Sequence, residues 1–157
     1  MITSIYSEKQ KITQLIRELK PIADDGPLYL QYIYSNHIVL KTGGFIENST
    51  KAIFYNYTNR HSKPEIAKFV EHHAGRMNSL NCEKIEKFAN QFDEDFWPKI
   101  KEQCDRTELE AIDSIKAIRD TIAHGKINGT GISIVIDHFN KACTFVEHME
   151  AIIYPSD

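Results

Sequence analysis

Residues 107–125 read TELEAIDSIKAIRDTIAHG and decide the fold expected for this chain. At about 100° per residue, the apolar positions of this stretch fall on one side of a helix. They are Ala111, Ile112, Ile115, Ile118 and Ile122. Thr107 and Glu110 have the spacing of a capping box, and Gly125 suits the left-handed conformation that ends many helices. The stretch therefore predicts an amphipathic helix from Thr107 to about Ala123.

The same helical period recurs through the rest of the chain. It predicts helices over residues 4–20, 28 to about 57, 64–75 and 133–153, and another that Asn81 caps. Pro21 is expected to end the first helix, and Asp24 or Asp25 to cap the second, with Pro27 in its first turn. Residues 93–106 are expected to form a connection with about one turn of helix. The pattern predicts an all-α bundle with a long second helix, as a single domain over residues 1–157.

One apolar side is expected for the helix over residues 64–75. Ile66, Phe69 and Val70 lie at three- and four-residue steps, which places them on the same side of a helix. We therefore expect these three side chains to share one side of the helix.

Length and composition limit the class of protein to which the chain can belong. The chain has 157 residues, with 41% hydrophobic and 26% charged residues, which excludes a disordered tail, a collagen-like repeat and a coiled-coil rod. It contains no run of about 18 apolar residues that would span a membrane, and its first residues lack the apolar core of a signal peptide. Three cysteines without C-x-x-C spacing favour a reducing compartment. We therefore expect a cytoplasmic protein.

Charge is unevenly distributed around a formal net charge of −3. Residues 1–80 hold ten Lys/Arg and seven Asp/Glu, whereas residues 81–157 hold nine and fifteen. A protein that grips a long duplex is expected to show a strongly basic face. A polyanion would therefore be bound at a small local site, or at a surface formed by two chains.

Arg119, Asp120 and His124 form the candidate site. On the helical count, Arg119 falls within the apolar stripe, where a guanidinium requires an anionic partner. Asp120 and His124 are four residues apart on the neighbouring polar edge. We expect the Asp120 carboxylate to accept a hydrogen bond from the imidazole and to fix its tautomer and orientation.

A cation, an imidazole and a carboxylate together suit a reaction in which negative charge develops on an anion. Cleavage of a phosphodiester by an adjacent 2′-hydroxyl is such a reaction, because a base takes the hydroxyl proton and an arginine stabilises the charge at phosphorus. This chemistry requires no metal, and we expect no cofactor. His61, His72, His73 and Cys82 lie close in sequence, but their spacing matches no usual zinc site.

The end of this expected helix resembles the motif of the HEPN superfamily. It has an arginine, a polar residue, three further residues and a histidine, followed by glycine. Other features are similar to the RiboL-PSP-HEPN branch of this superfamily: Gly44-Phe45-Ile46-Glu47 in the long second helix, the helix over residues 64–70, and the Gly-Thr-Gly turn at residues 129–131. The resemblance covers residues 29–153 and implies an all-α fold. It places the motif at Arg119, Asp120 and His124; the second position is often Asn in this branch, and Asp is an accepted variant.

The resemblance also implies an activity and partners. Active members are metal-independent ribonucleases in which two chains place their motifs side by side across a two-fold axis. We therefore expect a homodimeric endoribonuclease with RNA as substrate, serving as a toxin or phage-defence effector with an antitoxin or regulatory protein as a further partner.

Two alternatives remain open. The first is a catalytically inactive dimer that binds nucleotide, RNA or a protein, which the acidic second half of the chain and Asp120 favour. The second is a helical dimerisation unit in which Asp120 and His124 only stabilise the helix and Arg119 extends to the surface.

Overall fold

The computed structural model describes residues 1–126 and 128–155 as seven α-helices, without a strand in this part of the chain. They are α1 (Thr3–Asp25), α2 (Leu28–His61), α3 (Pro64–Gly75), α4 (Cys82–Ala89), α5 (Phe96–Gln103), α6 (Arg106–Ala123) and α7 (Ile132–Ile153). The predicted all-α fold is confirmed. Its long second helix is also confirmed, and at 34 residues it is the longest element described.

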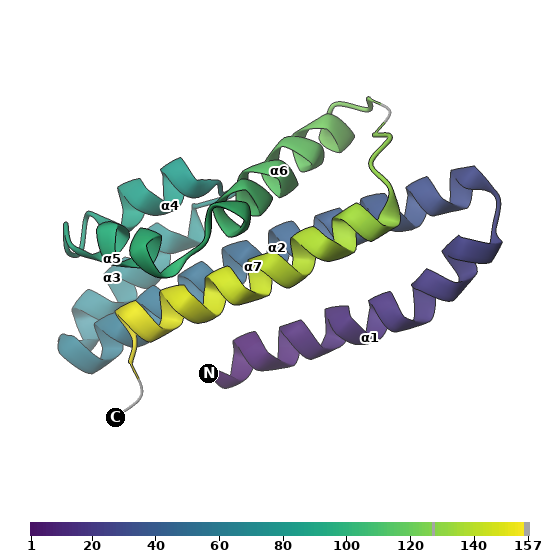
Figure 1. Cartoon of the computed structure of the whole chain (residues 1–157). Helices are drawn as coiled ribbons and strands as arrows, with labels where there is room; N and C mark the ends of the chain where they lie inside the picture. Colours follow the sequence, from purple (N-terminus) through teal and green to yellow (C-terminus); the bar gives the residue numbers. More distant parts are fainter. Residues whose placement is uncertain (127, 156–157) are drawn as a thin grey trace.

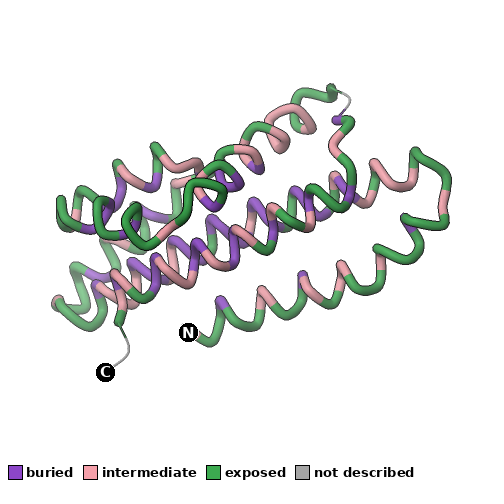
Figure 2. Tube along the Cα trace, viewed as in Figure 1, coloured by how far each residue is buried: buried purple, intermediate pink, exposed green. Residues whose placement is uncertain are grey.

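The helices α2 and α7 lie side by side at the centre of the bundle (Figure 1). The helix α1 packs along one side of this pair, and α6 packs on the other side together with the short helices α3, α4 and α5. The central pair contributes four fully buried aromatic side chains to the core: Phe45 and Phe54 of α2, and Phe139 and Phe145 of α7. Figure 2 shows the buried positions gathered along the central pair, whereas much of α1 is exposed.

Buried hydroxyl groups allow α2 to run through the middle of the core. Thr42, Thr50 and Thr58 each donate a hydrogen bond to the backbone carbonyl four residues earlier, at 2.7–2.8 Å. A buried hydroxyl without a partner would be costly, so these local bonds let polar residues occupy the core. This explains why α2 is less clearly two-sided in sequence than the other helices.

The boundary expected between the first two helices was wrong. Pro21 lies inside α1, which continues to Asp25, and Pro27 is the residue that precedes α2. Proline removes one backbone hydrogen bond from a helix. The carbonyl that loses its partner here belongs to Arg17, which is exposed, so water can satisfy it. Asp24 therefore lies in the last turn of α1 and pairs with Lys20 rather than capping α2.

The start of α6 also differs from the prediction. Asp105, not Thr107, is the N-cap: its carboxylate accepts hydrogen bonds from the backbone N–H groups of Thr107 and Glu108 at 2.5 and 3.3 Å. Glu110 pairs with Arg106 instead of closing a capping box. Asp is as good a cap as Thr and adds a negative charge at the positive end of the helix.

Residues 93–106, expected to form a connection with about one turn of helix, contain more helix than that. The segment forms the eight-residue α5, which buries Phe96, Trp97 and Ile100. The predicted Asn81 cap of α4 is confirmed, because its side chain accepts a hydrogen bond from the Lys84 backbone at 3.1 Å.

The apolar side expected for α3 is largely exposed, with only Val70 half-buried. Ile66 and Phe69 are 51% and 71% exposed, and the buried positions of this helix are Ala67 and Ala74. Small residues allow α3 to approach α2 closely, which leaves the larger side chains outside. Within the described residues, no helix has an apolar stretch long enough to cross a membrane.

Candidate functional site

Arg119 lies on α6 and reaches across to α2. Its Nη1 atom donates a hydrogen bond to Oε1 of Glu47, and the two side chains are 29% and 12% exposed. Gly43, one turn before Glu47 on α2, makes room for this contact. A Cβ atom at Gly43 would lie 3.2 Å from Cδ and 3.4 Å from Nη1 of Arg119. The anionic partner that the sequence requires for this arginine is thus an internal carboxylate.

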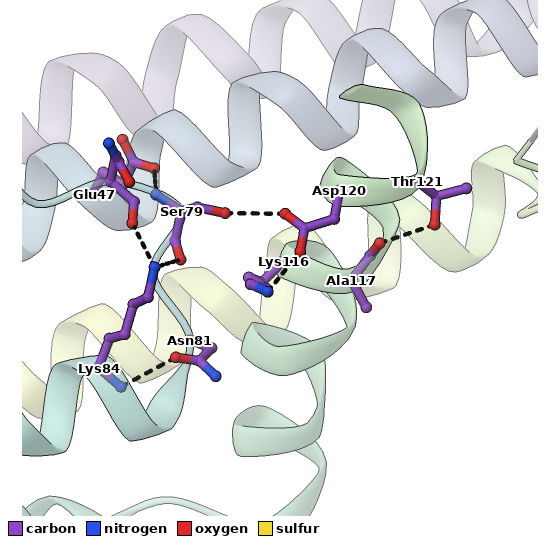
Figure 3. Close-up of polar contacts among 9 residues, drawn as sticks. Glu47, Ser79, Asn81, Lys84, Lys116, Ala117, Asp120 and Thr121 are labelled. Carbon is purple, nitrogen blue, oxygen red and sulfur yellow. Dashed lines mark hydrogen bonds and ion pairs between the residues drawn. The ribbon is translucent and has the colours of Figure 1, made fainter. Parts of the chain in front are cut away.

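Ser79 joins Glu47 to Asp120. Its backbone N–H donates to Glu47 Oε1 at 2.5 Å, and its hydroxyl donates to Asp120 Oδ1 at 3.1 Å (Figure 3). Ser79 has a φ of 50°, which is uncommon for a residue other than glycine. These two hydrogen bonds hold the loop between α3 and α4 against α2 and against the end of α6.

Asp120 has different partners from those expected. Its Oδ2 atom accepts a hydrogen bond from Lys116 Nζ at 2.5 Å, one turn earlier on α6 (Figure 3). Lys116 lowers the pKa of Asp120 most, and the Ser79 hydrogen bond and the nearby His124 lower it further. With both oxygens bonded to Lys116 and Ser79, the expected hydrogen bond to His124 is not formed.

His124 is the residue at which α6 ends. Its backbone N–H still donates to the Asp120 carbonyl at 3.0 Å, and its φ and ψ of −85° and 10° mark the end of the helix. Gly125 follows with a φ of 67°, which confirms the predicted helix end. The imidazole is exposed to solvent and lies at the carboxyl end of a helix, where a positive charge is favoured.

Lys84 adds a further cation to this polar network. Its Nζ donates to the backbone carbonyls of Asn78 and Ser79, both at 3.1 Å. The network thus holds three cations (Lys84, Lys116 and Arg119) against the two carboxylates of Glu47 and Asp120. One surplus positive charge remains before His124 is counted, which favours an anion such as a phosphate group.

A groove of about 280 Å³ adjoins the network through Lys84. Its walls include the basic side chains of Arg76 and Lys87 and the apolar side chains of Leu80 and Phe88. Sequence reasoning did not identify this groove or the contributions of Lys84 and Ser79. The four-residue spacing of Lys116 and Asp120 was readable in the sequence, but Glu47 is 72 residues from Arg119 and Ser79 is 41 residues from Asp120.

The fold and the motif define an all-α protein with a charged site at one helix end. A sequence model of the RiboL-PSP-HEPN family matches residues 3–154, so the chain belongs to this family. The match suggests a nuclease or RNA-binding module, and it extends beyond the expected residues 29–153 to include α1. No curated protein and no solved structure matches the chain.

One group of possible metal ligands occurs among the described residues, and the sequence did not predict it. Cys104, Glu108 and His148 each offer a ligand atom, and these atoms all lie within 4.8 Å of one another. The four-residue spacing of Cys104 and Glu108 was a readable signal, but His148 is 40 residues from Glu108. The histidines that precede α4 have other contacts: His61 packs against Tyr57, and His73 against Phe69.

Proposed function

We propose that this protein is a metal-independent endoribonuclease that cleaves RNA by attack of the 2′-hydroxyl group on the adjacent phosphodiester. Arg119, Asp120 and His124 of two chains would form a composite active site in a homodimer. The observation that carries the proposal is the Arg119 guanidinium, held in place five residues before an exposed imidazole in a member of the RiboL-PSP-HEPN family.

His124 and Arg119 have the chemical roles in this reaction. One His124 imidazole takes the proton of the 2′-hydroxyl, whose oxygen then attacks phosphorus. The P–O5′ bond breaks, and the leaving oxygen receives a proton from the His124 of the second chain. Arg119 stabilises the charge that develops on the phosphate oxygens. Its bond to Glu47 uses one of the five N–H donors of a guanidinium and orients the group before RNA binds.

Asp120 acts in this proposal through its neighbours. It does not orient His124 by a hydrogen bond; it positions Lys116 and the Ser79 loop beside Arg119. Arg76 and Lys84 line the groove and offer positive charge along which an RNA backbone can extend, whereas Lys87 is paired with Glu83. This supports RNA as the ligand despite the negative net charge of the chain.

A second candidate is an inactive dimer that binds RNA, nucleotide or protein. The Arg119–Glu47 ion pair favours it, because an internal carboxylate neutralises the cation that would meet the phosphate. An arginine bound in this way also stabilises the fold without any chemistry. The two candidates differ in whether any RNA product accumulates.

Incubation of purified protein with RNA in excess EDTA tests the proposal. The wild type is expected to release fragments that end in 2′,3′-cyclic phosphate, and His124→Ala is expected to release none. His37→Ala is the matched control, because His37 is an exposed histidine on α2 outside the network. Identical products from wild type and His124→Ala, or cleavage only with added metal, would contradict the mechanism.

Oligomeric state and RNA binding separate the remaining possibilities. Light scattering is expected to give the mass of two chains, and a stable monomer would contradict the composite site. If RNA binds without turnover and Arg119→Ala weakens that binding, the inactive binding module is the correct function.

A further inference from the structure

Three side chains from different helices meet where α5 ends and α6 begins. Cys104 directly follows α5 as its C-cap, Glu108 lies in the first turn of α6, and His148 lies on α7. The Sγ atom of Cys104 is 3.6 Å from Nδ1 of His148, and Oε2 of Glu108 is 3.1 Å from the same Nδ1. Glu108 is only 8% exposed, so its carboxylate is committed to this cluster.

The geometry excludes a catalytic Cys–His–Glu relay. Such a relay requires the thiol and the carboxylate to contact different ring nitrogens, so that a proton can pass through the imidazole. Here both groups contact Nδ1. Burial, and secondly the neighbouring Glu108, raise the pKa of the Cys104 thiol to about 12, whereas a nucleophilic cysteine requires a lowered pKa.

Three ligand atoms that converge on one point have instead the geometry of a metal site. With Zn–S near 2.3 Å and Zn–N near 2.0–2.1 Å at tetrahedral angles, the S···N distance is about 3.5 Å and the N···O distance about 3.3 Å. The observed distances are 3.6 and 3.1 Å. The cluster therefore needs only small side-chain movements to bind a cation of this size.

We propose that Cys104, Glu108 and His148 bind one Zn²⁺ ion, with water at the fourth position. A thiolate, an imidazole and a carboxylate form a ligand set of intermediate softness, which suits zinc. On binding, the Cys104 thiol releases its proton to solvent and its sulfur donates an electron pair to the metal. Thiolate and carboxylate then neutralise the two charges of the ion, which removes the cost of burying Glu108 as an anion.

The bound zinc connects the joint between α5 and α6 to α7. The site is separate from the proposed ribonuclease site, since Glu108 and His124 are sixteen residues apart and thus about 24 Å apart along α6. Zinc here has a structural role. Cys104→Ser is accordingly expected to cleave RNA in EDTA at the rate of the wild type, so the two proposals fail independently.

Cobalt substitution tests the site. Metal-free protein is titrated with Co²⁺, and the wild type is expected to show a thiolate-to-cobalt charge-transfer band that saturates at one ion per chain and disappears on addition of zinc. Cys104→Ser and His148→Gln are expected to lose the band and to bind zinc at least about 100-fold more weakly. Cys143→Ala is the matched control, because it removes a buried thiol that lies outside the cluster.

Thermal unfolding gives an independent measurement. Zinc is expected to raise the unfolding temperature of the wild type and of Cys143→Ala, but not of Cys104→Ser. Circular dichroism of the metal-free variants checks that each one folds, and Glu108→Gln, which preserves side-chain shape, replaces any variant that does not. Absence of the charge-transfer band in the wild type, or its persistence in Cys104→Ser and His148→Gln, overturns the proposal.

Discussion

Arg119 on α6 donates a hydrogen bond to Glu47 on α2, and this contact joins two helices across 72 residues of sequence. It occurs where Gly43 leaves space for the guanidinium and where Ser79 also bonds to the Glu47 carboxylate. An arginine on an apolar helix face is thereby accommodated within one chain. It lies five residues before His124, the residue that caps the same helix.

Glu47→Gln is expected to lower the free energy of unfolding by about 1.5–3 kcal/mol, the range for hydrogen bonds to charged groups. The substitution preserves the shape of the side chain but leaves the half-buried guanidinium without its counter-charge. Urea unfolding measures the effect. Glu83→Gln is the control, since it removes an exposed ion pair with Lys87. An equal loss in the free energy of unfolding for both variants would show that the Arg119–Glu47 pair stabilises the fold no more than an exposed ion pair.

Gly43→Ala is expected to reduce RNA cleavage or RNA binding several-fold while the protein stays folded. The added methyl group would lie 3.2 Å from Cδ of Arg119, so the guanidinium must shift. The neighbouring Gly44→Ala is a close control, because nothing lies within 4 Å of its Cβ position. It is expected to leave function intact and to stabilise α2 by up to about 1 kcal/mol. Equal RNA cleavage by the two variants would contradict this role for Gly43.

Asp105→Ala is expected to lower the thermal unfolding temperature more than Thr107→Ala does. Asp105 satisfies two backbone N–H groups at the start of α6, whereas the Thr107 side chain is not the cap. Helix N-caps are worth a measurable fraction of the stability of a small protein. If calorimetry shows a larger drop in unfolding temperature for Thr107→Ala than for Asp105→Ala, Thr107 and not Asp105 is the N-cap of α6.

The Asp120 carboxylate is expected to make stability depend on pH in the acid range. Lys116 and Ser79 lower its pKa in the folded state below the ordinary value of 3.8, and His124 contributes to the same effect. A lowered pKa means that the contribution is complete above the unfolded-state pKa and is lost as the pH falls through the folded-state pKa.

Asp120→Asn isolates this contribution. The stability difference between wild type and variant, measured by urea unfolding, should be largest near neutral pH and should shrink as the pH falls below about 4. A difference that stays constant from pH 7 to pH 3 would show that the Lys116–Asp120 pair does not affect stability.

The sequence by itself determined the helices and the composition of the motif. Apolar spacing, Asn81 and Gly125 are local signals, because helical period and caps depend on residues within a few positions. The order of the helices and the placement of Arg119 and His124 at one helix end therefore followed from reading the chain. Local signals misplaced three features: Pro21 does not end α1, residues 93–106 contain α5, and Asp105 rather than Thr107 caps α6.

Only the tertiary structure decided which charges meet. Glu47 and Ser79 reach the end of α6 because α2 and the loop after α3 pack there, and they take the partners that a helical count had assigned elsewhere. His148 meets Cys104 in the same way, through the packing of α7 against the α5–α6 joint. Ion pairs and ligand clusters depend on distances of a few ångströms between segments far apart in sequence, and chain packing sets those distances.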